Sequence, residues 1–303
     1  MEEQFCEVGG ISLCYEEFGV GNPEPLLLIM GLGAPMTAWP LAFCEQLVEQ
    51  GFHVIRFDNR DIGRSTVLEN LGVPPVGATL AGRKSAARYS LSDMAADAAG
   101  LLDHLEIDSA HVVGASMGGM IAQVLTIEHG RRVRSLTSIM STTGRRTAGT
   151  PHPTVMRSLV KQPPTHLGRE AEIEHFVEFF RSVGSRGELF EADAIRDSAR
   201  AALERGSTRG GTLRQLAAVS SSPDRTRRLR TLKQPVLVIH GSADRLIHPS
   251  GGRATAKAVP GSTYLEFSGM GHDFPSVLIP QMISAITAIT RRAAAAAPSP
   301  TPA

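Results

Sequence analysis

The chain has 303 residues, of which 42% are hydrophobic and 20% are charged, the composition of an ordinary globular protein that can build one large core. Its 31 basic residues nearly balance its 30 acidic ones, which argues against nucleic acid as a partner, because binding to its phosphates favours a basic excess. No apolar run approaches the ~20 residues of a membrane span, and the acidic start MEEQFCEVGG has no secretory signal, so we expect a cytoplasmic protein.

The first sixty residues predict strands around one helix. Residues 8–18 alternate apolar and polar side chains and contain a Gly-Gly pair, which is typical of a β-hairpin. The apolar runs Leu26–Met30 and His53–Phe57 predict strands that are buried on both faces. A one-sided apolar stripe between them predicts a helix over Pro40–Gln50.

Three cysteines, Cys6, Cys14 and Cys44, lie in this same region. Their odd number and their spacing match neither a disulfide framework nor a metal site. We therefore expect reduced thiols. Because the sequence also contains no metal-binding cluster and no nucleotide-binding loop, it predicts a protein without a cofactor.

The middle of the chain predicts alternating helices and strands. Residues 66–90 are rich in glycine, proline and basic residues and predict an excursion loop. Ser92 is then expected to cap a helix with Asp93 in its first turn. A strand, a turn and a helix follow over His111–Ile121, and Val133–Met140 predicts another strand. This alternation indicates a parallel sheet with helices on both faces.

The pattern changes between residues 142 and 232, which contain no strong strand signal. Two apolar stripes at helical spacing occur there instead, consisting of Ile173, Phe176, Val177 and Phe180 and of Ile195, Ala199, Ala202 and Leu203. A helical insertion explains both stripes.

The sheet pattern resumes in the last quarter of the chain. Gln234–His240 and Thr263–Phe267 predict strands, and a helix over Val277–Thr290 closes the domain. The tail AAAAAPSPTPA has nothing to pack against and is expected to be disordered. The predicted parts are an N-terminal core of residues 1–141, a helical insertion of residues 142–232, a C-terminal core of residues 233–291 and a tail of residues 292–303.

A candidate nucleophile lies in the G-x-S-x-G pentapeptide from Gly114 to Gly118. Between a strand and a helix, such a turn exposes the hydroxyl of Ser116 above the sheet. The glycines have a steric role, because a Cβ at either position would collide where the two backbones cross. The alternative is a turn of small residues in which the serine is incidental.

A base and an orienting acid are predicted further along the chain. Ser116, Asp244 and His272 each follow a predicted strand end, and loops at the carboxyl ends of parallel strands meet in one crevice. His272 would take the proton of the Ser116 hydroxyl, and Asp244 would hold the imidazole in the required tautomer. Asp273 is the lesser candidate for the acid, and His240 is expected to be structural.

Backbone amides are expected to hold the oxyanion of the tetrahedral intermediate. The Met117 amide is one donor, and the Leu32 amide, in the glycine loop after the third predicted strand, is the other. Asp58, Arg60 and Arg64 are expected to form a structural network of ion pairs and turns, because carboxylate–guanidinium pairs commonly brace loops.

Taken together, the motifs resemble those of the α/β-hydrolase family: MGLG, DNRDIGRS, GASMGG, GSADRLIHP and GMGH occur in the family's order over residues 8–290. The resemblance implies an α/β fold with a mostly parallel, eight-stranded sheet and a helical cap over the crevice. Within the family the chain resembles bacterial serine esterases and lipases, including methyl esterases of anthracycline-type polyketides. Met30 stands where many members have histidine, so the anchoring of the oxyanion loop is expected to differ.

These observations predict a cofactor-free serine hydrolase of small or lipophilic carboxylic esters. A C–C hydrolase, a thioesterase or a perhydrolase could use the same residues, and a small-molecule receptor without turnover is the alternative from another class. Epoxide hydrolase and haloalkane dehalogenase are disfavoured, because they need a carboxylate where Ser116 stands. The predicted cap phenylalanines either line an apolar pocket or form the core of the cap; they are Phe176, Phe179, Phe180 and Phe190.

Overall fold

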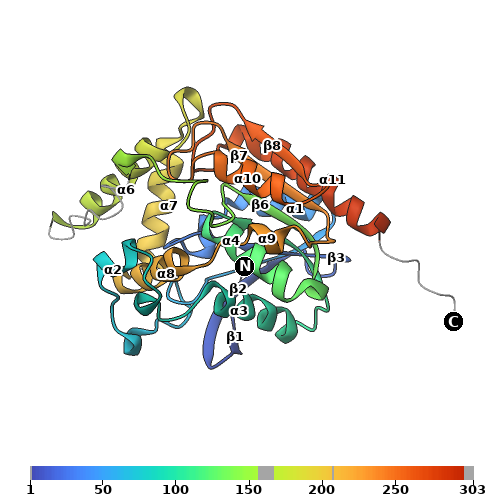
Figure 1. Ribbon diagram of the computed structural model, residues 1–303, viewed down its shortest axis with the longest axis horizontal. Coiled ribbons are helices and arrows are strands. Elements are labelled where there is room, and N and C mark those ends of the chain that lie inside the picture. The colour runs from blue at the N-terminus through green and yellow to red at the C-terminus, as the bar shows by residue number, and fades with distance from the viewer. Residues whose placement is uncertain (1, 156–166, 207, 297–303) are drawn as a thin grey trace.

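A single sheet of eight strands forms the centre of the molecule (Figure 1). The computed structural model describes residues 2–155, 167–206 and 208–296. In chain order the strands are β1 (Gln4–Val8), β2 (Ile11–Phe18), β3 (Glu24–Ile29), β4 (Phe52–Phe57), β5 (Ala110–Ala115), β6 (Val133–Ile139), β7 (Val236–Gly241) and β8 (Thr263–Phe267). They lie in the order β1-β2-β4-β3-β5-β6-β7-β8.

Strand β2 pairs antiparallel with both β1 and β4. The remaining neighbours, in the sheet order β4-β3-β5-β6-β7-β8, are all parallel. The mostly parallel sheet and the N-terminal hairpin are therefore confirmed. Each parallel crossover must return the chain to the same end of the sheet, which is why helices alternate with these strands.

The α-helices of the described residues are α1 (Leu41–Glu49), α2 (Val76–Leu80), α3 (Leu91–His104), α4 (Met117–Glu128), α6 (Arg169–Val183), α7 (Ala192–Glu204), α8 (Arg209–Ser221), α9 (Thr226–Leu229), α10 (Ser250–Ala258) and α11 (Ile279–Ala296). Short 3₁₀ turns lie at Met36–Ala38, Glu69–Leu71, Lys84–Ala86, Gly130–Arg132, Gly187–Leu189 and Ser276–Leu278. Helices α6 to α9 all fall between β6 and β7, and α6, α7 and α8 gather with α2 at the left of Figure 1.

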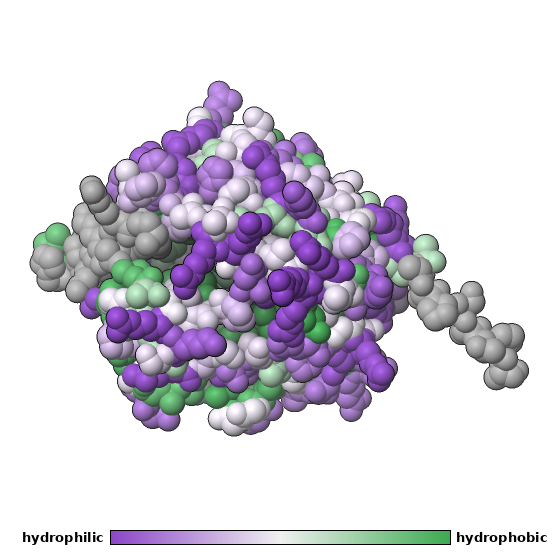
Figure 2. Space-filling view, viewed as in Figure 1, coloured by the Kyte–Doolittle hydropathy of each residue, from purple (hydrophilic) through white to green (hydrophobic). Residues whose placement is uncertain are grey.

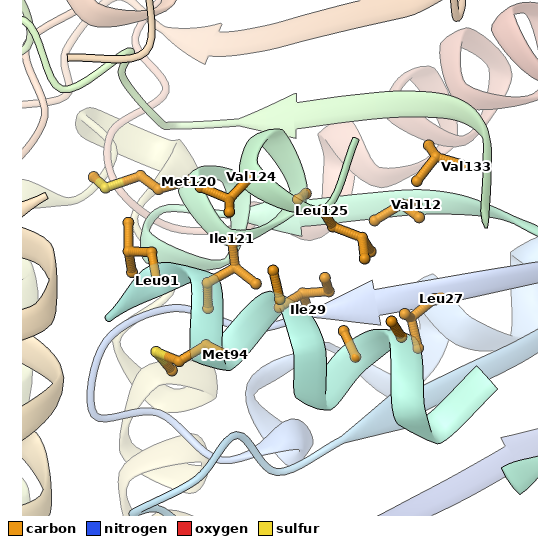
Figure 3. Close-up of a cluster of buried hydrophobic side chains, with 14 of the residues drawn as sticks. Leu27, Ile29, Leu91, Met94, Val112, Met120, Ile121, Val124, Leu125 and Val133 are labelled. Carbon is orange, nitrogen blue, oxygen red and sulfur yellow. The ribbon is translucent and has the colours of Figure 1, made fainter. Parts of the chain in front are cut away.

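Two apolar layers cover the two faces of the sheet. Leu27 and Ile29 of β3 point into the layer with α3 and α4, which Figure 3 shows. The alternate residues Leu26 and Leu28 point into the opposite layer, with α1 and α11. Side chains alternate along a strand, so a strand buried on both faces must be apolar at every position. This requirement explains the continuous apolar runs in the sequence.

The start of α3 differs from the prediction. Its N-cap is Ser90, not Ser92, and the Ser90 hydroxyl accepts a hydrogen bond from the Asp93 amide at 3.2 Å. The Asp93 carboxylate accepts in return from the Ser90 amide at 2.7 Å. This capping box needs an acidic residue three positions after the cap, and Ser90 meets that condition whereas Ser92 does not.

Two other segments are more helical than predicted. Residues 66–90 contain α2 and two 3₁₀ turns, and α2 packs against α8 from a distant part of the chain. Helix α11 continues to Ala296, five residues into the predicted tail, because alanine has the highest helix propensity. The rest of that predicted tail, residues 297–303, lies outside the described residues.

The three cysteines are free and buried. Burial, as the largest influence, raises the pKa of Cys6 and Cys44 to about 11 and that of Cys14 to about 12. The thiolate is the reactive form, so these side chains behave as core residues.

The face of the molecule in Figure 2 carries mostly hydrophilic residues, with hydrophobic ones in small separate areas. Among the described helices, none combines the length and the apolar character that a membrane crossing requires.

Candidate active site

Ser116 lies on a strained corner between β5 and α4. Its backbone has φ of +56° and ψ of −118°, a region that residues with a Cβ rarely adopt. An added Cβ at Gly114 would lie 2.2 Å from the Gly118 oxygen, and one at Gly118 would lie 2.0 Å from the Ile29 oxygen. The predicted steric role of both glycines is confirmed, because the backbones of β3, β5 and α4 meet there.

The structure brings Ser116, His272 and Asp244 together across 156 residues of sequence. The Ser116 Oγ lies 3.0 Å from His272 Nε2, and His272 Nδ1 lies 2.7 Å from Asp244 Oδ2. Since a carboxylate can only accept, Nδ1 carries the hydrogen and Nε2 presents its lone pair to the hydroxyl. The arrangement can therefore receive a proton from Ser116.

Asp244 is buried and remains ionised. Its Oδ1 accepts hydrogen bonds from the amides of Leu246 and Ile247, each at 2.9 Å. Burial alone would raise the pKa of Asp244, but the charge on His272, the nearby His240 and the hydrogen bond from His272 outweigh it and lower this pKa to about 2. The acid is thus a permanent acceptor at neutral pH.

His240 is fully buried beside this acid. Its Nε2 donates to the Ile247 carbonyl at 2.8 Å and lies 3.5 Å from Asp244 Oδ2. His240 therefore supports the acid loop and does not reach Ser116.

The loop after β3 lies against the serine. A Cβ built on Gly31 would be 3.1 Å from the Ser116 Cβ and 3.6 Å from its Oγ. The Met117 amide begins α4 and has no intrahelical acceptor. In the described part of the chain, no acceptor is found for the Leu32 amide either. The Met117 amide therefore directly follows Ser116 in sequence, and the Leu32 amide directly follows Gly31, which lies close to Ser116.

Asp273 does not serve His272. It accepts hydrogen bonds from the Ser185 hydroxyl at 2.5 Å and from the Ser185 amide at 3.0 Å. Burial raises the pKa of Asp273, and the bonds from Ser185 offset only part of this rise. The Val183 carbonyl also accepts from the His272 amide at 2.9 Å, so the end of α6 is joined to the loop that carries the histidine.

The three residues expected to brace the DNRD loop bind different parts of the molecule. Asp58 accepts from Arg205, the residue that follows α7, at 2.7 Å, and Arg60 pairs with Asp97 of α3 at 2.6 Å. The third, Arg64, pairs with the carboxylate of Glu3. The loop thus connects β4 to α3 and to the helices that precede β7.

The aromatic side chains of α6 contact one another. The Phe180 ring lies 4.9 Å from that of Phe176 and 5.6 Å from that of Phe179, measured between centroids. All three rings are half-buried, whereas Ile173 and Val177 of the same helix are fully buried. Only the aliphatic half of the predicted apolar stripe is therefore fully buried.

Three buried polar residues near the site were not predicted, namely Arg205, Arg214 and Gln215. Arg214 donates to both oxygens of Asp61, at 2.7 and 2.8 Å. The local signal for a buried polar residue is its position within the apolar stripe of a helix. The apolar stripe of α8 is too weak to give that signal. Among the described residues there is no group of three or more histidine, cysteine or acidic side chains that could hold a metal ion.

Comparison with known proteins gives consistent results. A model of the alpha/beta hydrolase fold matches residues 24–276. Rhodomycin D methylesterase DnrP of Streptomyces peucetius is 30% identical over 296 residues, which cover 91% of this chain and 94% of that protein. A 2-hydroxy-6-oxononadienedioate/2-hydroxy-6-oxononatrienedioate hydrolase of Burkholderia vietnamiensis is 27% identical over 262 residues, 85% of this chain and 83% of that protein.

Among solved structures, the meta-cleavage product hydrolase of Pseudomonas fluorescens IP01 is similar in fold. Its TM-score is 0.74 at 19% identity, with 96% of this chain and 98% of that chain covered. At this identity the similarity concerns the fold alone.

Proposed function

Since the chain belongs to the alpha/beta hydrolase fold family, we propose that it is a serine hydrolase that cleaves carboxylic esters through an acyl-enzyme. Ser116 is the nucleophile, His272 the general base and Asp244 the residue that orients the base. The observation that carries the proposal is the continuous pair of hydrogen bonds from Ser116 through His272 to Asp244, at 3.0 and 2.7 Å.

The reaction proceeds in two halves. In the first, Ser116 Oγ attacks the ester carbonyl while His272 Nε2 takes its proton, and His272 then returns the proton to the departing alcohol. In the second, His272 takes a proton from water, the hydroxide attacks the acyl-enzyme, and His272 returns the proton to Ser116 Oγ as the acid leaves. Asp244 stabilises the imidazolium in both halves without accepting its proton.

The oxyanion of each tetrahedral intermediate is held by the amides of Leu32 and Met117. The proximity of Gly31 to Ser116 supports this assignment, because the Leu32 amide belongs to the peptide that follows Gly31. Backbone donors that are fixed by the fold need little reorganisation during the reaction, which is why they are effective.

The substrate is a small-molecule ester, and the relative named a methylesterase favours a methyl ester of a larger acid. Residues 142–232 act as the cap over the crevice, between the two core parts, residues 1–141 and 233–291. This assignment is supported by the hydrogen bonds that join the region to both site loops, at His272 and at Gly33. The cap thereby sets the shape of the crevice.

A fluorophosphonate probe tests the proposed nucleophile. The folded protein should be labelled at one residue, and Ser116→Ala should abolish the label. Ser138→Ala is the matched control, because it removes a buried hydroxyl from the neighbouring strand β6 and should leave labelling unchanged. Equal labelling of the wild type and Ser116→Ala, or no labelling of the folded wild type, would contradict the proposal.

Hydrolysis of a carbon–carbon bond is the second candidate, since one relative is named a 2-hydroxy-6-oxononadienedioate/2-hydroxy-6-oxononatrienedioate hydrolase. A substrate panel separates the candidates. Methyl esters, thioesters and 2-hydroxy-6-oxo-dienoates are compared by kcat/KM, and esters should be preferred. Preference for a dienoate would replace the esterase assignment while retaining the same nucleophile.

A further inference from the structure

The loop between β3 and α1 is held by side chains from two different parts of the chain. Three contacts anchor it: Asn59 Nδ2 donates to the Met30 carbonyl at 3.0 Å, Asp58 Oδ1 accepts from the Met36 amide at 2.7 Å, and Gln215 Oε1 accepts from the Gly33 amide at 2.8 Å. Two of these side chains follow β4. The third, Gln215, belongs to helix α8, in the region between β6 and β7.

Gln215 is fully buried and uses both ends of its side-chain amide. While Oε1 accepts from Gly33, Nε2 donates to the Arg60 carbonyl at 2.8 Å. The orientation of the amide is determined by its partners, because one is a backbone donor and the other a backbone acceptor. Gln215 therefore bridges the loop after β3 and the loop after β4.

Helix α8 also restricts Gly33 sterically. Gly33 has a φ of +66°, and a Cβ built on it would lie 3.0 Å from the Thr212 methyl carbon. The neighbouring Arg214 binds the buried carboxylate of Asp61 through two hydrogen bonds, so α8 cannot shift without breaking a buried ion pair. The helix thus presents Gln215 to Gly33 from a fixed position.

We propose that Gln215 is a positioning residue for the oxyanion loop, by engaging the Gly33 amide and thereby setting the direction of the adjacent Leu32 peptide. The inference rests on the proposed function, in which the Leu32 amide holds the oxyanion. The helices between β6 and β7 then contribute to transition-state stabilisation as well as to the shape of the crevice.

Gln215→Leu tests this role, because leucine is of similar size and makes no hydrogen bond. With a methyl ester as substrate, kcat should fall by ~10- to 100-fold, since small displacements of an oxyanion donor have effects of this order, while KM should change by less than ~3-fold. Affinity for a trifluoromethyl ketone, which forms a tetrahedral adduct with the serine, should fall by the same factor as kcat.

Gln123→Leu is the matched control. Gln123 is a fully buried glutamine on α4 that is bonded to Ser138 and Arg225, so its replacement loses the same amide groups away from the oxyanion loop. It should lower the melting temperature and leave kcat and ketone affinity within ~2-fold. Activity is expressed per folded molecule, from the far-UV circular dichroism of each variant.

Gln215→Glu adds a readout that a purely structural role would not change. A protonated carboxyl can accept from Gly33 and donate to the Arg60 carbonyl, as glutamine does, whereas a carboxylate can only accept. The ratio of kcat in this variant to kcat in the wild type should therefore rise as the pH falls. A ratio independent of pH, or wild-type kcat and ketone affinity in Gln215→Leu, would overturn the inference. Absence of ester turnover in the wild type would overturn the proposed function first, and this inference with it.

Discussion

Replacement of Gly118 by alanine is expected to destabilise the protein and to slow acylation of Ser116. Gly118 lies in the first turn of α4, and an added Cβ would lie 2.0 Å from the Ile29 oxygen and 2.7 Å from the Met30 oxygen. Ordinary contacts begin at 3.4 Å, so the end of β3 and the start of α4 must separate by about 1.4 Å, the difference between 3.4 and 2.0 Å.

The size of the effect follows from what must move. Overpacking usually costs ~1–3 kcal/mol, and the upper end applies here because backbone atoms cannot turn aside as side chains do. With an unfolding entropy of ~2.1 cal/mol/K per residue over 303 residues, ~3 kcal/mol corresponds to a melting temperature lower by roughly 5 °C. Since the displaced segment continues into the proposed oxyanion loop, kcat should fall by ~10²-fold. Thermal unfolding and the rate of acyl-enzyme formation measure the two effects.

Gly77→Ala is the control for this substitution. Gly77 lies in α2, and a Cβ there would meet nothing within 4 Å. Alanine should therefore be neutral or stabilising by up to ~1 kcal/mol, through its higher helix propensity. If Gly118→Ala had the melting temperature and the acylation rate of the wild type, the reasoning that the β3 and α4 backbones meet at Gly118 would be refuted.

Other contacts predict further measurable effects. Arg214→Met leaves the Asp61 carboxylate buried without its ion-pair partner and should cost ~3–5 kcal/mol in urea unfolding at pH 7. Burial raises the pKa of Asp61, but hydrogen bonds from Arg214, Leu68 and Tyr89 lower it below 3.8 overall. The stabilisation by the Asp61 carboxylate is therefore present above pH 3.8 and decreases as the pH falls further. If Arg214→Met lost the same free energy of unfolding at all pH values, this explanation would be contradicted. Asp244→Asn should lower kcat by ~10⁴-fold, because an amide can hold the wrong histidine tautomer, whereas wild-type kcat should show no ionisation of Asp244 above about pH 3, given its pKa of about 2. Ser90→Ala should cost ~1 kcal/mol of stability as the loss of a cap, and Ser92→Ala less than ~0.5 kcal/mol; the reverse order would favour Ser92 as the cap.

Much of the fold could be predicted because the signals are local. The apolar run of β3 predicts a strand buried on both faces, and the glycines around Ser116 predict a tight turn. Each of these patterns is contained within a few consecutive residues. The start of α3 was also within reach, since the spacing of Ser90 and Asp93 contains the capping box. The short helix α2 was not predictable in this way, because its packing against α8 involves residues far away in the sequence.

Local sequence patterns predict which groups follow each strand, and the parallel topology then brings Ser116, Asp244 and His272 to the same end of the sheet. In contrast, which buried polar residues form hydrogen bonds with one another depends on the tertiary structure. Gln215 meets Gly33 across 182 residues, and Arg214 meets Asp61 across 153, with no periodicity to indicate either pair. The pattern of apolar residues along a helix or strand indicates whether a side chain is buried. A hydrogen bond between distant residues depends in addition on where the fold positions the second segment.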